Sequence, residues 1–339
     1  MHQTRREFMK SALAIGAAAN LAGAGGNGLE GEPPGAMPRR VLGRTKQSVT
    51  ILGLGCAYAG GGIPESDTTA IIEAALEGGV RYFDAAPEYT AAEERLGPVI
   101  APVRDECFLV TKTYAFNAKD AEKDLAGSLK RLKTDHVDLF LQHGVGLRPT
   151  EETEQALWQD GSLAFLCKAK KEGLTRFIGM SVHARHPGVL LLLDESDAWD
   201  VVMPFVNYVA RAQDTGEREV EGLVPRAQRD NLGVVAMKVL GGNPGLLADD
   251  YDRAFRYALS VPGVACALIG VRSVAEVKRA VRAAKEFRPF TAAEMAETIR
   301  KGEEIVREKS EKSAMLYRHR TRDFGSFYYA RSGSSESVV

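Results

Sequence analysis

Short apolar runs alternate with longer amphipathic stretches along most of this 339-residue chain. Apolar runs of four to eight residues between turn signals predict strands, and stretches with a 3.6-residue period predict helices. The predicted strands are residues 49–55, 80–86, 107–112, 136–143, 175–181, 200–205, 233–238 and 263–270. The predicted helices are residues 66–78, 91–101, 118–132, 151–172, 185–194, 216–230, 249–259 and 273–285.

Eight strand-helix alternations predict an α/β protein whose strands close into a (β/α)₈ TIM barrel. The alternative is a doubly wound open sheet, which would place a G-x-G-x-x-G turn after its first strand. The segment LGLGCAYAGGGIP (52–64) does not supply that turn, so the barrel is favoured. One further helix is predicted at residues 290–310.

The first residues are typical of an export signal. Charged residues open the chain, and a run of small and apolar residues, 11–24, ends in the cleavage candidate Ala22-Gly23-Ala24. This run is shorter than the roughly 18 residues that span a bilayer, so we expect no stable membrane span. Thr4-Arg5-Arg6-Glu7-Phe8-Met9-Lys10 resembles the twin-arginine (Tat) signal pattern. We therefore expect a periplasmic or otherwise exported protein that uses the Tat machinery.

Four segments follow from these patterns. They are a signal peptide at 1–24, a Gly/Pro/Glu-rich linker at 25–38, a barrel at 39–289, and a C-terminal helix and tail at 290–339.

Charge and cysteine content exclude several classes of partner. The chain has 44 Lys and Arg against 45 Asp and Glu, a net charge of −1, and removing residues 1–24 takes away three bases and one acid, leaving −3. No basic excess is present to bind nucleic acid. The cysteines stand far apart and show no C-x-x-C pair, which argues against structural zinc and a disulfide framework. No cysteine follows Cys266, so we expect no C-terminal iron–sulfur cluster, and we expect no metal site.

Titratable residues stand where predicted strands end. Asp84, Lys112 and His143 end three consecutive strands, and Tyr89 follows Asp84 in the same loop. Because the carboxyl ends of barrel strands meet at one face, we expect these side chains to share a rim. Singly, each has an ordinary structural reading: a helix cap, a solvated lysine, a core histidine and a packing tyrosine.

Several segments resemble the aldo-keto reductase family in order. RRVLGRTKQSVTILGLG (39–55) resembles its opening β-hairpin and first strand, and FDAAPEYTAAEERLG (83–97) resembles its FDTA-x-x-Y-G-x-x-E-x-x-LG segment. LVTKT (109–113), VDLFLQH (137–143) and GLTRFIGMS (173–181) continue the match. The resemblance implies a nicotinamide-dependent oxidoreductase with the catalytic residues Asp84, Tyr89, Lys112 and His143.

These four residue types suit carbonyl reduction. The carbonyl oxygen must receive a proton as hydride arrives at carbon. Tyr89 would supply that proton, although the pKa of a free tyrosine is about 10. The Lys112 ammonium, held by Asp84, would favour the phenolate, and His143 would donate to the substrate oxygen.

The resemblance also implies a set of cofactor contacts, with departures from the family pattern. Arg272 suits an adenosine 2′-phosphate, so NADP(H) is favoured over NAD(H). Arg279 either joins it or is a solvated helix residue. Val182 and Met203 replace the family's amide partners of the nicotinamide, Met237 replaces its stacking aromatic, and Glu276 and Ala280 differ at the adenine. The expected cofactor-binding residues are Cys56, Ser181, Lys238, Val239, Leu240, Gly241 and Arg272.

The hypothesis is an exported NADPH-dependent reductase of a small aldehyde, ketone or sugar. The departures motivate an alternative, a non-catalytic barrel that binds a nucleotide or a sugar as a sensor or auxiliary protein. Cys56 is interpreted as a small apolar pocket residue or a redox sensor, and the other three cysteines as core.

Overall fold

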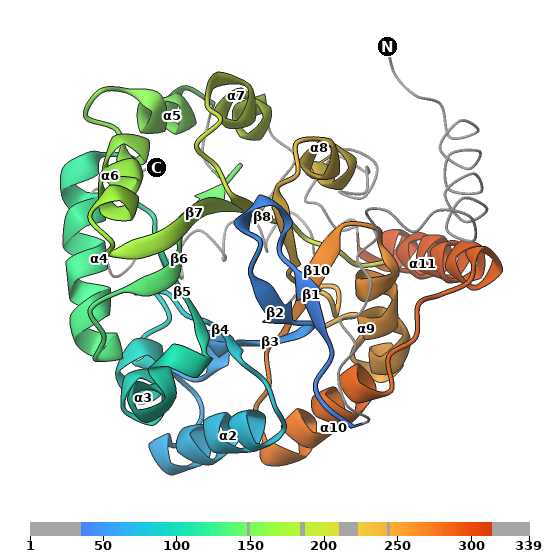
Figure 1. Ribbon diagram of the computed structural model, residues 1–339. Coiled ribbons are helices and arrows are strands. Elements are labelled where there is room, and N and C mark those ends of the chain that lie inside the picture. The colour runs from blue at the N-terminus through green and yellow to red at the C-terminus, as the bar shows by residue number, and fades with distance from the viewer. Residues whose placement is uncertain (1–34, 148–149, 184–186, 210–222, 243–244, 314–339) are drawn as a thin grey trace.

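The computed structural model describes residues 35–147, 150–183, 187–209, 223–242 and 245–313. Eight parallel strands close into a barrel in the order β10-β3-β4-β5-β6-β7-β8-β9, and helices surround it (Figure 1). The predicted (β/α)₈ fold is therefore confirmed. The barrel strands are β3 (Leu52–Gly55), β4 (Tyr82–Asp84), β5 (Phe108–Thr113), β6 (Val137–Val145), β7 (Thr175–Val182), β8 (Val201–Met203), β9 (Gly233–Ala236) and β10 (Val264–Ile269).

The helices follow the predicted order. They are α2 (Glu65–Glu77), α3 (Ala92–Ile100), α4 (Ala118–Leu132), α5 (Thr150–Glu154), α6 (Ser162–Lys171), α7 (Pro187–Glu195), α8 (Leu223–Arg229), α9 (Tyr251–Ser260), α10 (Val274–Lys285) and α11 (Ala292–Ser313). Parts of two predictions, 185–186 and 216–222, lie outside the described residues.

One predicted helix is wrong. Residues 151–172 form two helices, α5 and α6, separated by a 3-10 turn and an irregular stretch that ends at Gly161. That stretch pairs with the loop after β5, since Asn117 and Gly161 form an antiparallel bridge and the Ser162 amide donates to the Phe116 carbonyl at 2.9 Å. A Cβ at Gly161 would overlap the backbone carbonyls of Gln155 and Ala156. This tertiary pairing overrides the helical pattern.

A two-stranded hairpin closes one end of the barrel, as the resemblance implied. β1 (Arg39–Val41) pairs antiparallel with β2 (Ser48–Thr50), so the predicted strand 49–55 is divided between the hairpin and β3. Leu42 in its turn is fully buried against Gly233, where β9 begins. Arg40 donates to the carbonyls of Leu259 and Val264 at 2.8 and 2.7 Å. The hairpin thus covers the amino ends of the strands, and Figure 1 shows it lying across the barrel.

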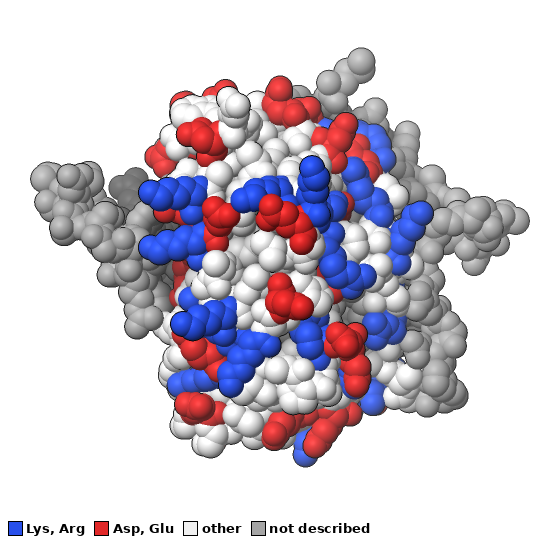
Figure 2. All heavy atoms as spheres, turned by 60° about the vertical axis from the view of Figure 1, so that its left-hand side comes forward, with Lys and Arg blue, Asp and Glu red and all other residues white. Residues whose placement is uncertain are grey.

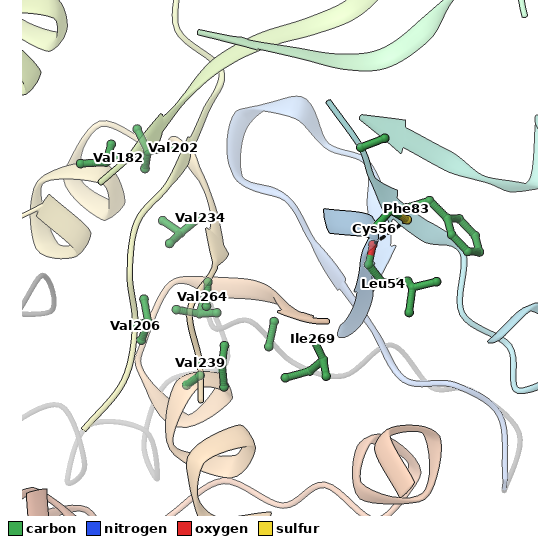
Figure 3. Packing of buried hydrophobic residues seen from close by; sticks show 14 of the residues in the cluster. Leu54, Cys56, Phe83, Val182, Val202, Val206, Val234, Val239, Val264 and Ile269 are labelled. Carbon is green, nitrogen blue, oxygen red and sulfur yellow. Dashed lines mark hydrogen bonds between the residues drawn. The ribbon is translucent and has the colours of Figure 1, made fainter. Parts of the chain in front are cut away.

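Strand side chains alternate between two apolar layers. Tyr82, Val110 and Leu141 belong to a cluster inside the barrel, whereas Val182 and Val202 belong to the layer between strands and helices (Figure 3). Because strand side chains repeat every two residues, the residue two positions after each interior one also points inward. Asp84, Lys112 and His143 are those residues on β4, β5 and β6.

The outer surface carries charges of both signs. On the face shown in Figure 2, Lys and Arg are interspersed with Asp and Glu, without one sign dominating. The C-terminal extension begins with α11, which packs beside α9, and Arg256 pairs with Glu294 at 2.8 Å (Figure 1). In the described part of the chain, no helix has the length and apolar character needed to cross a membrane. The signal at 1–24 and the tail beyond residue 313 lie outside the described residues.

Candidate active site

Lys112 connects three groups at the carboxyl ends of the strands. Its Nζ donates to Asp84 Oδ2 at 2.7 Å, to the Ala85 carbonyl at 2.7 Å and to the Tyr89 hydroxyl at 3.3 Å. The Lys112 side chain is 1% exposed and that of Asp84 5% exposed. The structure therefore brings three of the four predicted catalytic residues into direct contact.

The loop after β4 is built to hold Tyr89 over this pair. The Ala85 amide donates to the Val110 carbonyl at 2.9 Å, and the Tyr89 amide donates to the Ala86 carbonyl at 3.1 Å. The backbone of Gly60, in the loop after β3, lies against the Tyr89 carbonyl so closely that a Cβ there would overlap it. Sequence reasoning missed Gly60, although the run Gly60-Gly61-Gly62 signalled a close backbone approach.

His143, the fourth predicted catalytic residue, lies beside this group. Its ring centroid is 5.9 Å from that of Tyr89 in an edge-on arrangement. The Tyr114 ring stacks on the imidazole with 4.1 Å between the ring centroids, and Glu88 Oε2 lies 3.4 Å from His143 Nδ1. Sequence reasoning missed Tyr114 and Glu88 because neither ends a predicted strand.

Burial and the two nearby lysines determine the charge of the site. Burial raises the pKa of Asp84, and Lys112 partly opposes this shift. Burial, together with Lys112 and Lys238, holds the pKa of His143 well below its usual range. The imidazole is therefore neutral at physiological pH and has one N–H to donate. Burial also raises the pKa of Glu88 to about 7.

The predicted pyrophosphate loop follows β9 as a tight turn. The Gly241 amide donates to the Lys238 carbonyl at 2.8 Å, and Asn207 donates to the same carbonyl at 3.2 Å. Gly241 has a φ of +79°, which favours glycine, and Lys238 has a φ of 53°. Val239 is buried and Leu240 half-buried. Burial and Lys112 lower the pKa of Lys238, so this side chain lies near the catalytic group.

Arg272 is an exposed residue just before α10, and its guanidinium lies 4.5 Å from the ring centroid of Tyr58. Arg279 instead lies over Tyr251 and 3.5 Å from Asp252. The two arginines therefore stack on different rings. Glu276 accepts from the Arg272 amide at 2.7 Å.

The two remaining expected cofactor residues, Cys56 and Ser181, are both buried. Burial raises the pKa of the Cys56 thiol to about 12, so it stays protonated, which fits a small apolar residue better than a redox sensor. Ser181 accepts from the Gly144 amide at 3.0 Å. The prediction that the other cysteines are core is wrong for Cys167, which is exposed on α6. Cys107 and Cys266 are buried as expected.

Val182 does not point toward the site. It is buried in the layer between the strands and the helices (Figure 3), and His183 takes the next inward position. The His183 Nε2 is buried and has no hydrogen-bond partner among the described residues. Met203 and Met237 belong to the interior cluster. Within the described ranges, no three His, Cys, Asp or Glu side chains gather so that they could hold a metal ion.

A family model described as the aldo/keto reductase family matches residues 51–255, more than half of the chain. The chain belongs to the aldo/keto reductase family. The match includes all four residues of the predicted tetrad, and their individual roles stay predictions.

Among curated aldo/keto reductase relatives, the chain is similar to an L-galactose dehydrogenase of Arabidopsis thaliana and a methylglyoxal reductase of Escherichia coli. The first is 30% identical over 156 residues, 42% of this chain and 47% of the relative. The second is 35% identical over 115 residues, 32% of this chain and 40% of the relative. The alignments thus span less than half of either relative.

Solved aldo-keto reductase structures resemble this chain in fold over about three quarters of its length. An aldo-keto reductase from Pseudomonas aeruginosa is 27% identical, covers 73% of this chain and 94% of its own, and has a TM-score of 0.60. An aldo-keto reductase from Klebsiella pneumoniae, solved with NADPH, is 21% identical, covers 77% of this chain and 93% of its own, and has a TM-score of 0.61. At 21% identity, the similarity to the Klebsiella pneumoniae structure shows only that the two proteins share a fold.

Proposed function

We propose that this aldo/keto reductase reduces a small carbonyl compound, an aldehyde, ketone or sugar, with NADPH. The observation that carries the proposal is the Lys112 ammonium, which contacts both the Asp84 carboxylate and the Tyr89 hydroxyl. A lysine buried between a carboxylate and a tyrosine hydroxyl is typical of a functional site, because packing alone does not require a buried charge.

Tyr89 is the proton donor in this proposal. A cation 3.3 Å from the phenol oxygen stabilises the phenolate that remains after the proton has moved to the substrate oxygen. The Asp84 carboxylate holds the ammonium in place and balances its charge in a buried setting. In the reverse direction the phenolate takes the proton from an alcohol.

His143 orients the carbonyl. A neutral imidazole donates one hydrogen bond, which stabilises the negative charge developing on the substrate oxygen. Tyr114, stacked on the ring at 4.1 Å, limits its rotation. The substrate oxygen is thereby placed between His143 and Tyr89.

The residues present fit a nicotinamide dinucleotide phosphate. The Lys238–Gly241 turn offers backbone that a pyrophosphate can approach, with a lysine beside it, and Arg272 offers an exposed guanidinium for a 2′-phosphate. The unpartnered His183 Nε2 supplies a polar contact near the catalytic group. When bound, the reduced nicotinamide supplies the hydride.

The test is carbonyl-dependent oxidation of NADPH across a panel of aldehydes, ketones and sugars. We expect turnover by the wild-type protein and a loss of at least about 100-fold in Tyr89→Phe, because a general acid contributes roughly 10²–10⁴ in rate. Tyr82→Phe is the matched control, since Tyr82 lies inside the barrel, stacked on Phe108 at 5.1 Å. Unchanged activity in Tyr89→Phe would refute the role of Tyr89. Tight NADPH retention without turnover on any carbonyl would favour the non-catalytic alternative.

We also propose export through the twin-arginine pathway, supported by the Thr4–Lys10 pattern. A protein exported after folding can carry a cofactor acquired in the cytoplasm. Cell fractionation and mass spectrometry of the exported protein test this: we expect a mature chain that begins after Ala24, and retention inside the cell when Arg5 and Arg6 are both changed to Lys. Export of that double variant would contradict the proposal.

A further inference from the structure

Glu88 and His143 form a pair that the tetrad chemistry leaves unexplained. Glu88 immediately precedes Tyr89, and its Oε2 lies 3.4 Å from His143 Nδ1. The His143 side chain is 2% exposed and that of Glu88 20% exposed. Because Glu88 faces Nδ1, the opposite ring nitrogen, Nε2, is the one that can meet a substrate oxygen.

The charges around the pair decide which of its protonation states exist. His143 faces Lys112 from β5 and Lys238 from the end of β9, and His183 at the end of β7 lies 5.6 Å away, ring to ring. Two cations and burial oppose a positive imidazole. The pair therefore does not separate into a carboxylate and an imidazolium, and His143 exists as one of its two neutral tautomers.

Charged side chains from β5 and α4 surround Glu88. From β5 it faces Lys112, and from α4 it faces Arg131 and Asp124; its own backbone amide also contacts the carboxylate. Burial outweighs the favourable cations and raises the pKa of Glu88 to about 7. The carboxyl is thus protonated below about pH 7 and ionised above it.

We propose that Glu88 is a positioning residue that selects the tautomer of His143 and so decides whether His143 can donate to a carbonyl oxygen. This inference rests on the proposed carbonyl reduction. A protonated carboxyl donates its O–H to Nδ1, which places the imidazole proton on Nε2, toward the substrate. An ionised carboxylate accepts from Nδ1–H, which leaves Nε2 as an acceptor that repels a carbonyl oxygen.

The tautomer can be measured without any catalysis. In cofactor-free protein labelled with ¹⁵N in its histidines, long-range ¹H–¹⁵N spectra distinguish Nδ1–H from Nε2–H. The His143→Asn variant identifies the His143 signals among those of the six histidines. In wild type we expect the Nε2–H form at about pH 6 and the Nδ1–H form at about pH 8.5, on either side of the Glu88 transition.

Two Glu-to-Gln variants separate the roles. In Glu88→Gln we expect one His143 tautomer pattern at both pH values, since neither partner then titrates. Glu94→Gln is the matched control, because Glu94 lies on α3, is 52% exposed and stands 3.9 Å from Arg131. This control should show the same pH-dependent change of the His143 tautomer as the wild type. The proposal is overturned if the wild-type His143 tautomer is the same at both pH values, or if the change of tautomer persists in Glu88→Gln.

The kinetic consequence gives a second readout. Because a hydrogen bond to a charged group favours one tautomer by roughly tenfold or more, kcat/KM for a carbonyl should fall about tenfold between about pH 6 and pH 8.5. This fall should be absent in Glu88→Gln and present in Glu94→Gln. If no carbonyl is reduced, the proposed function fails, while the spectra still decide whether Glu88 sets the tautomer.

Discussion

Replacing Lys112 by Met should destabilise the barrel in a pH-dependent way. Both side chains of the Lys112–Asp84 pair are almost fully buried, with 2.7 Å between Nζ and Oδ2. Met conserves most of the lysine volume, so the substitution removes the charge and leaves packing nearly intact. It leaves the Asp84 carboxylate buried, with Oδ1 already unpartnered among the described residues.

Removing one partner of a buried ion pair costs about 3–5 kcal/mol, because the other charge stays behind without compensation. Asp84 can escape this cost by taking up a proton. Burial already raises its pKa in the folded protein, and removing Lys112 removes the cation that opposes the rise. The variant's Asp84 should therefore be protonated over a wider pH range than the wild type's.

The sign of the pH dependence follows from proton binding. A carboxyl whose pKa is higher in the folded than in the unfolded chain keeps a proton that the unfolded chain releases above about pH 3.9. Stability then falls as pH rises from that value to the folded pKa, by about 1.4 kcal/mol per pH unit. In Lys112→Met we expect a modest loss at about pH 5 and the full loss at about pH 8.

Urea denaturation followed by far-UV circular dichroism at these two pH values measures the effect. We expect the urea midpoint of Lys112→Met to fall by about 1 M or more at the higher pH, from typical m-values of about 1–3 kcal/mol/M. The double variant Lys112→Met/Asp84→Asn has no carboxylate to titrate, so its additional pH dependence should vanish. Parallel pH profiles of wild type and the single variant would refute the reasoning.

Two further predictions concern side chains close to the tetrad. Tyr82→Phe should raise the free energy of unfolding by about 1 kcal/mol, because the Tyr82 hydroxyl is buried without a partner among the described residues. Thermal denaturation measures this change, and a lowered Tm would contradict the prediction. Gly60→Ala should lower kcat/KM for carbonyl reduction by about tenfold or more, because its Cβ would displace the Tyr89 backbone. Gly61→Ala is the control, since its Cβ would meet only Thr90 Oγ1 at 3.4 Å, and equal activities of the two variants would contradict the prediction.

The barrel could be predicted from the sequence because its strands are buried on both faces and appear as continuous apolar runs. Asp84, Lys112 and His143 could be located for the same reason, since each interrupts such a run at its carboxyl end. The break within the predicted helix 151–172 could not be predicted, because it depends on a contact with a distant segment. The break before Gly161 results from pairing with Asn117.

Single side chains inside the site are also hard to predict when their position depends on tertiary structure. Matching motifs singled out Val182, but which side of β7 faces the barrel depends on the strand's orientation, and this places His183 inward. The contact between Glu88 and His143 joins the loop after β4 to β6, 55 residues apart. Spacing along the chain carries no signal for such a contact.

The β1–β2 hairpin makes one end of the barrel better suited than the other to the attachment of a fusion partner. Gly35 to Arg39 enter at the end that the hairpin covers, with Met37 against Gly79 before β4 begins. The catalytic residues stand at the other end of the same strands. An affinity tag, fluorescent protein or surface linker joined ahead of Gly35 would therefore leave the chain on the side away from Tyr89. The same direction suits immobilisation, with the reactive rim facing solution.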